Sequence, residues 1–245
     1  MLHRYAWSES SLILDLLTRE QGRTAVVAKG AKRPYSQLRP VLLPFQRLTV
    51  SLGRLPAGDA ASDVQTLRGA EWAGGAAMLT GAALFSGFYL NELLMKLLAR
   101  HDPHVLLFDV YAQTLTALAA PDDVAVQAAL RAFELSLLKE IGVLPDLSLV
   151  TLTQQPVHAD APYSLTTDAG VVAAPRAGLD AALTGAALTG LQAALQHGSV
   201  PALQQAAAAD LPALKAQLRQ LLQHHLGAAP LRTRQVMLGV QNLER

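Results

Sequence analysis

Two kinds of hydrophobic spacing divide this chain. Up to about residue 70, the apolar residues form short runs of strand length, and in residues 46–52 every second residue is apolar, which is typical of a half-buried strand. From about residue 73 onward, apolar residues recur at the three- and four-residue spacing of helices. The pattern predicts a β-rich part followed by an α-helical part.

We expect five short strands in the first part, at residues 2–7, 11–18, 23–28, 46–52 and 64–70. The sequence REQG joins the second and third strands, and it has the length and the glycine of a hairpin connection. A long irregular connection separates the third strand from the fourth. These features suit an OB-type barrel. Because the first strand begins almost at Met1, the sequence leaves open whether Met1 is the true start.

Helical spacing predicts helices at residues 73–100, 105–118, 122–141, 186–196 and 211–226. Asp122 or Asp123 can cap the third. Residues 148–175 lose this spacing and contain possible small strands at 163–166 and 170–173. The predicted fold class is therefore α+β, with an OB-fold β-barrel at residues 1–71, an α-helical domain at 72–245, and a hairpin-like insertion at 148–175 within it.

Composition narrows the class of protein. The chain has 245 residues, of which 51% are hydrophobic and 16% charged, as in folded proteins. It has no cysteine, which excludes disulfides, thiolate zinc sites and cysteine nucleophiles. Glu92, Lys96 and Arg100 interrupt the longest apolar windows before they reach the roughly 20 residues that span a membrane. With no secretory signal pattern at the start, we expect a cytoplasmic protein.

Charge is distributed unevenly along the chain. The net charge is only +1, but residues 1–70 hold ten Lys or Arg against five Asp or Glu. A surface that binds nucleic acid requires such a local positive field. A charged face that is only solvated and binds no ligand would have the same composition. The candidate DNA-binding residues are Arg23, Lys29, Lys32, Arg33, Arg39, Arg47 and Arg54.

Three aromatic residues lie in or near the same part of the chain. Tyr35 and Phe45 flank the basic loop, where they could stack on bases or serve in packing. We expect Trp7, which falls in the first strand, to lie in the core.

Other motifs give weaker signals. His101, Asp102 and His104 form the sequence HDPH, which allows a metal-dependent phosphodiesterase but is better explained as a loop that ends a helix. Gly185 and Gly190 have the spacing of a phosphate-binding loop, but the required Lys and Ser or Thr do not follow. We therefore expect no cofactor, no metal and no enzymatic activity.

Four segments carry a resemblance to a known family. They are the opening hairpin with its basic loop, YLNELL at residues 89–94, LRAFELSLL at 130–138, and LGAAPLRTR at 226–234. In this order and at these separations, they resemble the bacterial RecO family of DNA repair and recombination mediators. Thr233 stands where the family usually has serine. Many members hold zinc with four cysteines in the insertion, and without cysteines this chain cannot share that site.

The resemblance implies a function and several partners. Such a mediator would bind single- and double-stranded DNA near the nucleoid, anneal complementary strands, and help to load recombinase together with RecR. It would also engage single-stranded DNA-binding protein, whose acidic tail would bind at Arg131. The alternative for Arg131 is an ordinary surface arginine paired with Glu134. The alternative for the whole chain is a protein-interaction adaptor whose basic barrel does not bind DNA.

Overall fold

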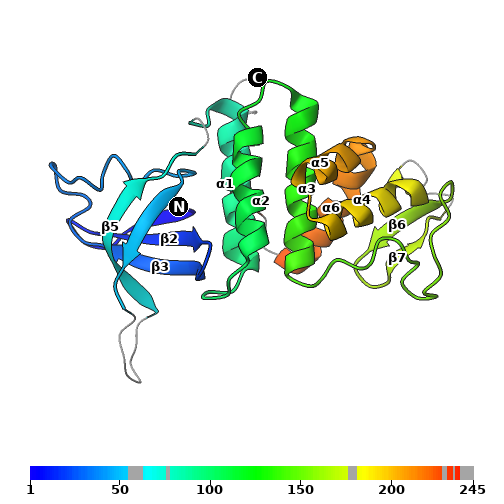
Figure 1. Cartoon of the computed structure of the whole chain (residues 1–245), viewed down its shortest axis with the longest axis horizontal. Coiled ribbons are helices and arrows are strands. Elements are labelled where there is room, and N and C mark those ends of the chain that lie inside the picture. Colours follow the sequence, from blue (N-terminus) through cyan, green and yellow to red (C-terminus); the bar gives the residue numbers. More distant parts are fainter. Residues whose placement is uncertain (55–62, 76–77, 176–180, 228–230, 234, 238–245) are drawn as a thin grey trace. The chain divides into compact units, whose positions relative to one another are not determined.

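The computed structural model describes residues 1–54, 63–75, 78–175, 181–227, 231–233 and 235–237 (Figure 1). The chain divides into two compact units, Met1–Ala119 with Leu231–Arg245, and Ala120–Pro230. The first unit contains the barrel strands and the first two helices of the chain, and the second contains the helices between residues 123 and 226 and a small sheet.

The first unit begins with a five-stranded sheet. Its strands are β1 (His3–Ala6), β2 (Leu12–Thr18), β3 (Gly22–Ala28), β4 (Leu48–Leu52) and β5 (Val64–Trp72). They lie in the order β1-β2-β3-β5-β4, and β3 pairs parallel with β5 while the other neighbours are antiparallel. The five predicted strands and the long connection between the third and fourth are confirmed. The α+β class with an N-terminal OB fold is confirmed as well.

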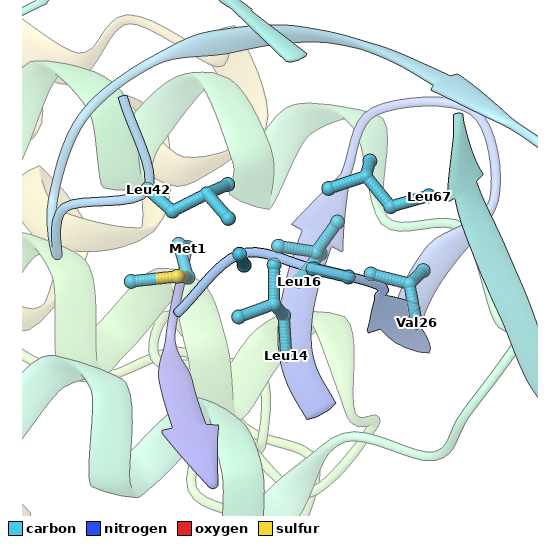
Figure 2. Packing of buried hydrophobic residues seen from close by; sticks show 8 residues of the cluster. Met1, Leu14, Leu16, Val26, Leu42 and Leu67 are labelled. Carbon is cyan, nitrogen blue, oxygen red and sulfur yellow. The ribbon is translucent and has the colours of Figure 1, made fainter. Parts of the chain in front are cut away.

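One face of this sheet forms the core of the barrel (Figure 2). Alternation along β2 and β3 directs Leu14, Leu16 and Val26 to that face, where they are almost fully buried. Leu42 from the long connection packs on the same cluster, as does Leu67 of β5. The long connection is therefore fixed to the barrel by its own apolar side chains.

Helices α1 (Gly81–Leu97) and α2 (Val105–Ala117) follow the sheet in the first unit. The prediction that the first helix starts at residue 73 is wrong, because β5 continues to Trp72 and Gly74 and Gly75 then adopt positive φ angles. Buried Asn91 of α1 donates from Nδ2 to the carbonyl oxygen of Leu2 at 2.8 Å. Its Oδ1 accepts a 2.5 Å hydrogen bond from Tyr111 of α2.

The second unit contains four helices with named bounds and three short strands. The helices are α3 (Asp123–Glu140), α4 (Gly185–His197), α5 (Val200–Ala208) and α6 (Leu211–Leu226), and the strands are β6 (Pro162–Thr166), β7 (Gly170–Ala173) and β8 (Leu183–Thr184). The cap by Asp122 is confirmed, since its side chain accepts from the amide of Val124 at 3.0 Å. The predicted hairpin is also confirmed, whereas α5 was not predicted.

The small sheet, in the order β7-β6-β8, is held by side chains rather than by thiolates. Buried Gln217 of α6 accepts from the amide of Leu165 at 2.9 Å and donates to the carbonyl oxygen of Ala181. The hydroxyl oxygen of Thr151 accepts from the amide of Val171 at 2.8 Å. Gln217 thus ties the insertion to α6, and Thr151 joins two parts of the insertion itself.

Across the described ranges, no helix is long and apolar enough to cross a membrane.

Candidate nucleic-acid interface

The loop that follows β3 presents three cations from a fixed backbone. Lys29, Lys32 and Arg33 are exposed, whereas Ala31 between them is buried in the barrel core. Gly30 has a φ of 70°, which allows the chain to reverse there. We call residues 29–33 the basic loop.

Lys32 attaches the basic loop to the turn between β1 and β2. Its amide donates to the carbonyl oxygen of Ser10 at 2.9 Å, and its Nζ donates to the carbonyl oxygen of Ser8 at 2.8 Å. The ammonium group remains exposed while it makes this contact. The loop thus holds its positive charges in a defined position before any ligand arrives.

The other exposed cations are more widely spaced. Arg39 lies further along the same connection, while Arg47 and Arg54 flank β4 at its two ends. Arg47 lines a cavity of about 750 Å³ beside β4 and α2. The structure therefore gathers the cations of the basic loop and leaves Arg47 and Arg54 at separate positions.

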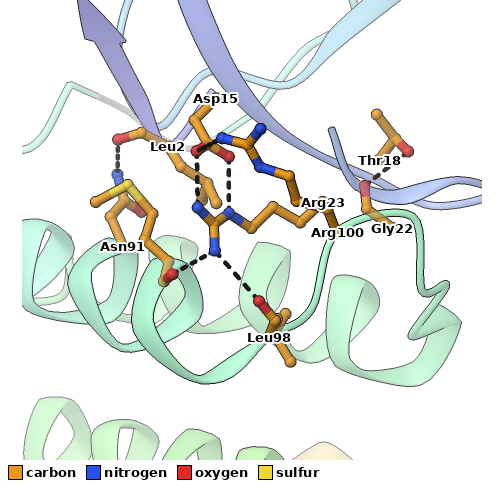
Figure 3. A network of polar contacts seen from close by, with 9 residues as sticks. Leu2, Asp15, Thr18, Gly22, Arg23, Asn91, Leu98 and Arg100 are labelled. Atoms are coloured by element: carbon orange, nitrogen blue, oxygen red, sulfur yellow. Dashed lines mark hydrogen bonds and ion pairs between the residues drawn. The ribbon is translucent and has the colours of Figure 1, made fainter. Parts of the chain in front are cut away.

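Arg23 is part of the interior rather than of the surface (Figure 3). Its Nε and Nη2 donate to the two carboxylate oxygens of Asp15 at 2.9 and 3.0 Å. Its Nη1 donates to the carbonyl oxygens of Met95 and Leu98 in and after α1. All three nitrogens of its guanidinium are therefore engaged within the first unit, which disfavours the predicted contact of Arg23 with DNA.

The three aromatic residues discussed from the sequence have different environments. Trp7 is 67% exposed, so its expected place in the core is wrong. Phe45 is buried and packs edge-to-face on Phe88 with ring centroids 5.1 Å apart, which excludes stacking on a base in this conformation. Tyr35 is 95% exposed. The exposed aromatic side chains of the barrel are thus partly different residues from those that the sequence suggested.

Sequence reasoning also missed Tyr5 and Arg68, which are exposed on β1 and β5. His3, Tyr5 and Trp7 alternate along the chain, so a strand places their three rings on one side, a signal that was available but was not used. It could not show which side faces the core.

The HDPH sequence forms a loop that packs on the β2–β3 hairpin. His101 donates its amide to the carbonyl oxygen of Arg23 at 2.9 Å, and His104 lies 3.5 Å from the carboxylate of Asp102. Among the residues that the structure describes, no group of three or more His, Cys, Asp or Glu is placed to hold a metal ion. These contacts favour the interpretation of HDPH as a connecting loop.

Arg131 lies on α3 in the second unit and is buried. Its Nη2 donates to Glu134 at 2.7 Å, and the two side chains are 7% and 2% exposed. Arg131 is paired with Glu134, as the alternative drawn from the sequence has it, but the pair is buried and does not lie on the surface. Its buried Nε has no hydrogen-bond partner in the described part of the chain.

The folded chain thus presents an OB barrel with a fixed cationic loop, followed by helices, and this arrangement defines the class of OB-fold proteins with an exposed cationic loop. Residues 1–74 match the family described as "Recombination protein O N terminal", and residues 78–235 match "Recombination protein O C terminal". The chain therefore belongs to the RecO family of DNA repair proteins.

Relatives named "DNA repair protein RecO" match over almost the whole chain. That of Verminephrobacter eiseniae is 51% identical over 243 residues, which are 99% of this chain and 95% of the relative. That of Variovorax paradoxus is 51% identical over 250 residues, with the same shares covered. A role in DNA repair follows from this membership.

Two of the segments that resemble the family meet in the first unit. The carboxylate of Glu92, in YLNELL, accepts hydrogen bonds from the amides of Arg232 and Thr233 at 2.9 and 3.0 Å. It also accepts from the hydroxyl of Thr233 at 2.7 Å. Since serine offers the same hydroxyl, threonine at this position preserves the contact.

Proposed function

We propose that this protein is a non-enzymatic mediator of DNA repair and recombination that binds single- and double-stranded DNA through its barrel. Lys29, Lys32 and Arg33 of the basic loop would contact phosphates, with Arg39, Arg47 and Arg54 adding charge around them. The observation that carries this proposal is the attachment of Lys32 to the β1–β2 turn, which fixes exposed cations on an OB barrel.

Such a surface would anneal complementary strands without ATP. Each cation that neutralises a phosphate releases condensed counterions, so binding gains free energy at low salt. Cations between two strands also reduce the repulsion of their phosphates, and base pairing then supplies the driving force. This function would be carried out in the cytoplasm beside the nucleoid.

The test is annealing of complementary oligonucleotides by a Lys32→Glu, Arg33→Glu double variant. We expect its annealing rate to fall at least tenfold. Lys215→Glu with Arg219→Glu is the matched control, because it makes the same charge change at exposed positions of α6. Equal annealing by the two double variants would contradict the proposal.

We further propose that α3 binds the acidic, phenylalanine-ended tail of single-stranded DNA-binding protein through Arg131, and that the protein acts with RecR to load recombinase. These partners come from the family resemblance. Because Arg131 is paired with Glu134 in a buried site, a tail carboxylate would compete with the carboxylate of Glu134 for the guanidinium.

A tail peptide distinguishes this binding mode from a purely structural ion pair. We expect Arg131→Ala to weaken the binding of the tail peptide at least tenfold. We expect Glu134→Gln to strengthen the binding of this peptide, because the competing charge is removed. If Glu134→Gln weakens the binding of the peptide as much as Arg131→Ala does, the ion pair stabilises the fold and the proposed competition for Arg131 is wrong.

A further inference from the structure

The sheet of the barrel has a second face, opposite its core, that carries exposed rings. In the β1–β2 ladder, Arg4 lies opposite Leu14, a core residue, so the alternate residues Tyr5 and Trp7 belong to the other face. The ladder continues to Trp7, whose amide donates to the carbonyl oxygen of Ser11 at 3.3 Å.

This face continues across three more strands. Tyr5 pairs with Ile13, Ile13 with Val27, and Val27 with Thr66, so one row crosses β1, β2, β3 and β5. The three inner members of the row are half-buried, while Tyr5 at the edge is 48% exposed. We call Tyr5, Trp7, Ile13, Val27 and Thr66 the aromatic face.

The rings at its edge are unusually accessible. Trp7 is 67% exposed, and Tyr5 is held edge-to-face by His3 with ring centroids 4.5 Å apart. Large aromatic side chains bury much area when they bind, so two of them exposed two residues apart, in β1 and just after it, indicate a contact surface. A strand backbone also limits their movement, which lowers the entropy lost on binding.

One cation is attached beside these rings, and others are exposed on the neighbouring strands. The carbonyl oxygen of Ser8, the residue after Trp7, accepts the hydrogen bond from Lys32 Nζ at 2.8 Å. Lys29 is exposed one residue after the end of β3, and Arg68 is exposed two residues beyond Thr66 on β5. Glu9 is an exposed acidic residue of the β1–β2 turn.

We propose that the aromatic face is a base-stacking surface that gives this protein its preference for single-stranded over double-stranded DNA. Tyr5 and Trp7 stack on unpaired bases, while Lys29, Lys32 and Arg68 neutralise the phosphates between them. The inference rests on the proposed DNA binding and assigns it a substrate class. Bases in a duplex already stack on each other, whereas those of a single strand offer free π-faces that bind aromatic side chains strongly.

A protein partner is the other candidate for this face, and the charges disfavour it. The cores of protein–protein interfaces are depleted of lysine, whereas here Lys32 binds the carbonyl oxygen of the residue that follows Trp7. In a nucleic acid strand, the bases can stack on exposed rings and the phosphates can bind to nearby cations.

Intrinsic fluorescence reports on Trp7 directly. The chain has two tryptophans, so Trp72→Phe leaves Trp7 as the only indole. We expect oligothymidine to quench its emission to a saturable limit, and a hairpin duplex of the same charge to change it little. Quenching of equal size by both DNAs would overturn the inference, since stacking would then not depend on unpaired bases.

Affinity gives the second measurement, again with single-stranded and duplex oligonucleotides. We expect Tyr5→Ala with Trp7→Ala to lose at least tenfold in affinity for oligothymidine and less than twofold for duplex, while Trp7→Phe retains most single-strand affinity because it keeps a ring. Leu152→Ala is the control, since it removes another exposed apolar side chain, in the second unit. We expect it to bind as the wild type does.

The outcomes separate this inference from the proposed function. If Tyr5→Ala with Trp7→Ala leaves both affinities unchanged while Lys32→Glu with Arg33→Glu lowers both, DNA binding stands and the aromatic face is not its stacking surface. If the Tyr5→Ala, Trp7→Ala variant loses a protein partner but keeps its affinity for single-stranded DNA, the aromatic face is likewise not a stacking surface. If the wild type binds neither DNA, the proposed function fails and this inference fails with it.

Discussion

Asp15 and Arg23 form a two-point ion pair on neighbouring strands, with side chains only 2% and 15% exposed. Arg23 →Ala would leave the carboxylate of Asp15 buried without this partner, so we expect it to lower the free energy of unfolding by about 3 kcal/mol. Urea unfolding measures this, with exposed Arg33→Ala as a control of little effect. Unchanged stability combined with lost DNA binding would instead place Arg23 in the interface.

Gly22 is a position where a side chain has no room. A Cβ atom there would lie 2.0 Å from the carbonyl oxygen of Asp102, and the φ of Gly22 is 65°. We expect Gly22→Ala to destabilise the protein by about 3 kcal/mol or more, because it adds a backbone clash to left-handed strain. Gly142→Ala is the control, as its φ is 75° but nothing lies within 4 Å, so about 1 kcal/mol is expected. Equal thermal stability of the two variants would refute the close approach.

Glu92 makes stability depend on pH. Burial raises the pKa of its carboxyl, but the hydrogen bonds from Thr233 and Arg232 and the charge of Lys96 outweigh this, and its pKa is below the ordinary value of 4.5. A lowered folded pKa means that Glu92 stabilises the fold above about pH 4.5 and that this contribution is lost as the pH falls through the folded pKa.

The Glu92→Gln variant tests this dependence. We expect it to be about 1 to 3 kcal/mol less stable than wild type at pH 7, because charge-assisted hydrogen bonds are lost, and to lose less stability on acidification. Thr233→Ser should behave as the wild type does, since it keeps the hydroxyl that donates to Glu92. Parallel stability curves for wild type and Glu92→Gln between pH 3 and pH 7 would contradict the assignment.

Gln217 should be necessary for the small sheet. Its removal in Gln217→Ala leaves the amide of Leu165 and the carbonyl oxygen of Ala181 without their partner, at a cost of about 1 to 3 kcal/mol. Amide hydrogen exchange in β6 should therefore become faster. Gln220→Ala, on the exposed side of the same helix, is the control and should leave exchange unchanged. Unaltered protection of Leu165 in the Gln217 variant would show that the sheet does not depend on this side chain.

Much of the fold could be predicted because its signals are local. Period-two alternation gave β4, the REQG turn gave the β2–β3 hairpin, and Asp122 gave the start of α3. The start of α1 could not be predicted from spacing, since Ala73 to Thr80 has helix-forming residues but is preceded by a strand and contains Gly74 and Gly75 with positive φ. The short helix α5 was missed because an alanine-rich run has little periodicity.

The candidate site was less predictable because it depends on pairs distant in sequence. Lys32 could be selected as a cation, but its contact with Ser8 requires the fold. Arg23 had the same charge and lay on the same hairpin, yet its partners are Asp15 and carbonyl groups of residues more than 70 positions later. Sequence shows which residues are charged; tertiary packing decides which of them remain available to a ligand.

The salt dependence of oligothymidine binding tests the central claim most directly, namely that the basic loop contacts phosphates. The affinity of wild type and of a Lys32→Ala, Arg33→Ala variant is measured between about 50 and 300 mM salt, and log affinity is plotted against log salt. For a single strand, each phosphate contact contributes about 0.7 units to the slope of this plot. We predict a slope shallower by about 1.4 units in the variant. Equal slopes, with or without a change in affinity, would contradict the account.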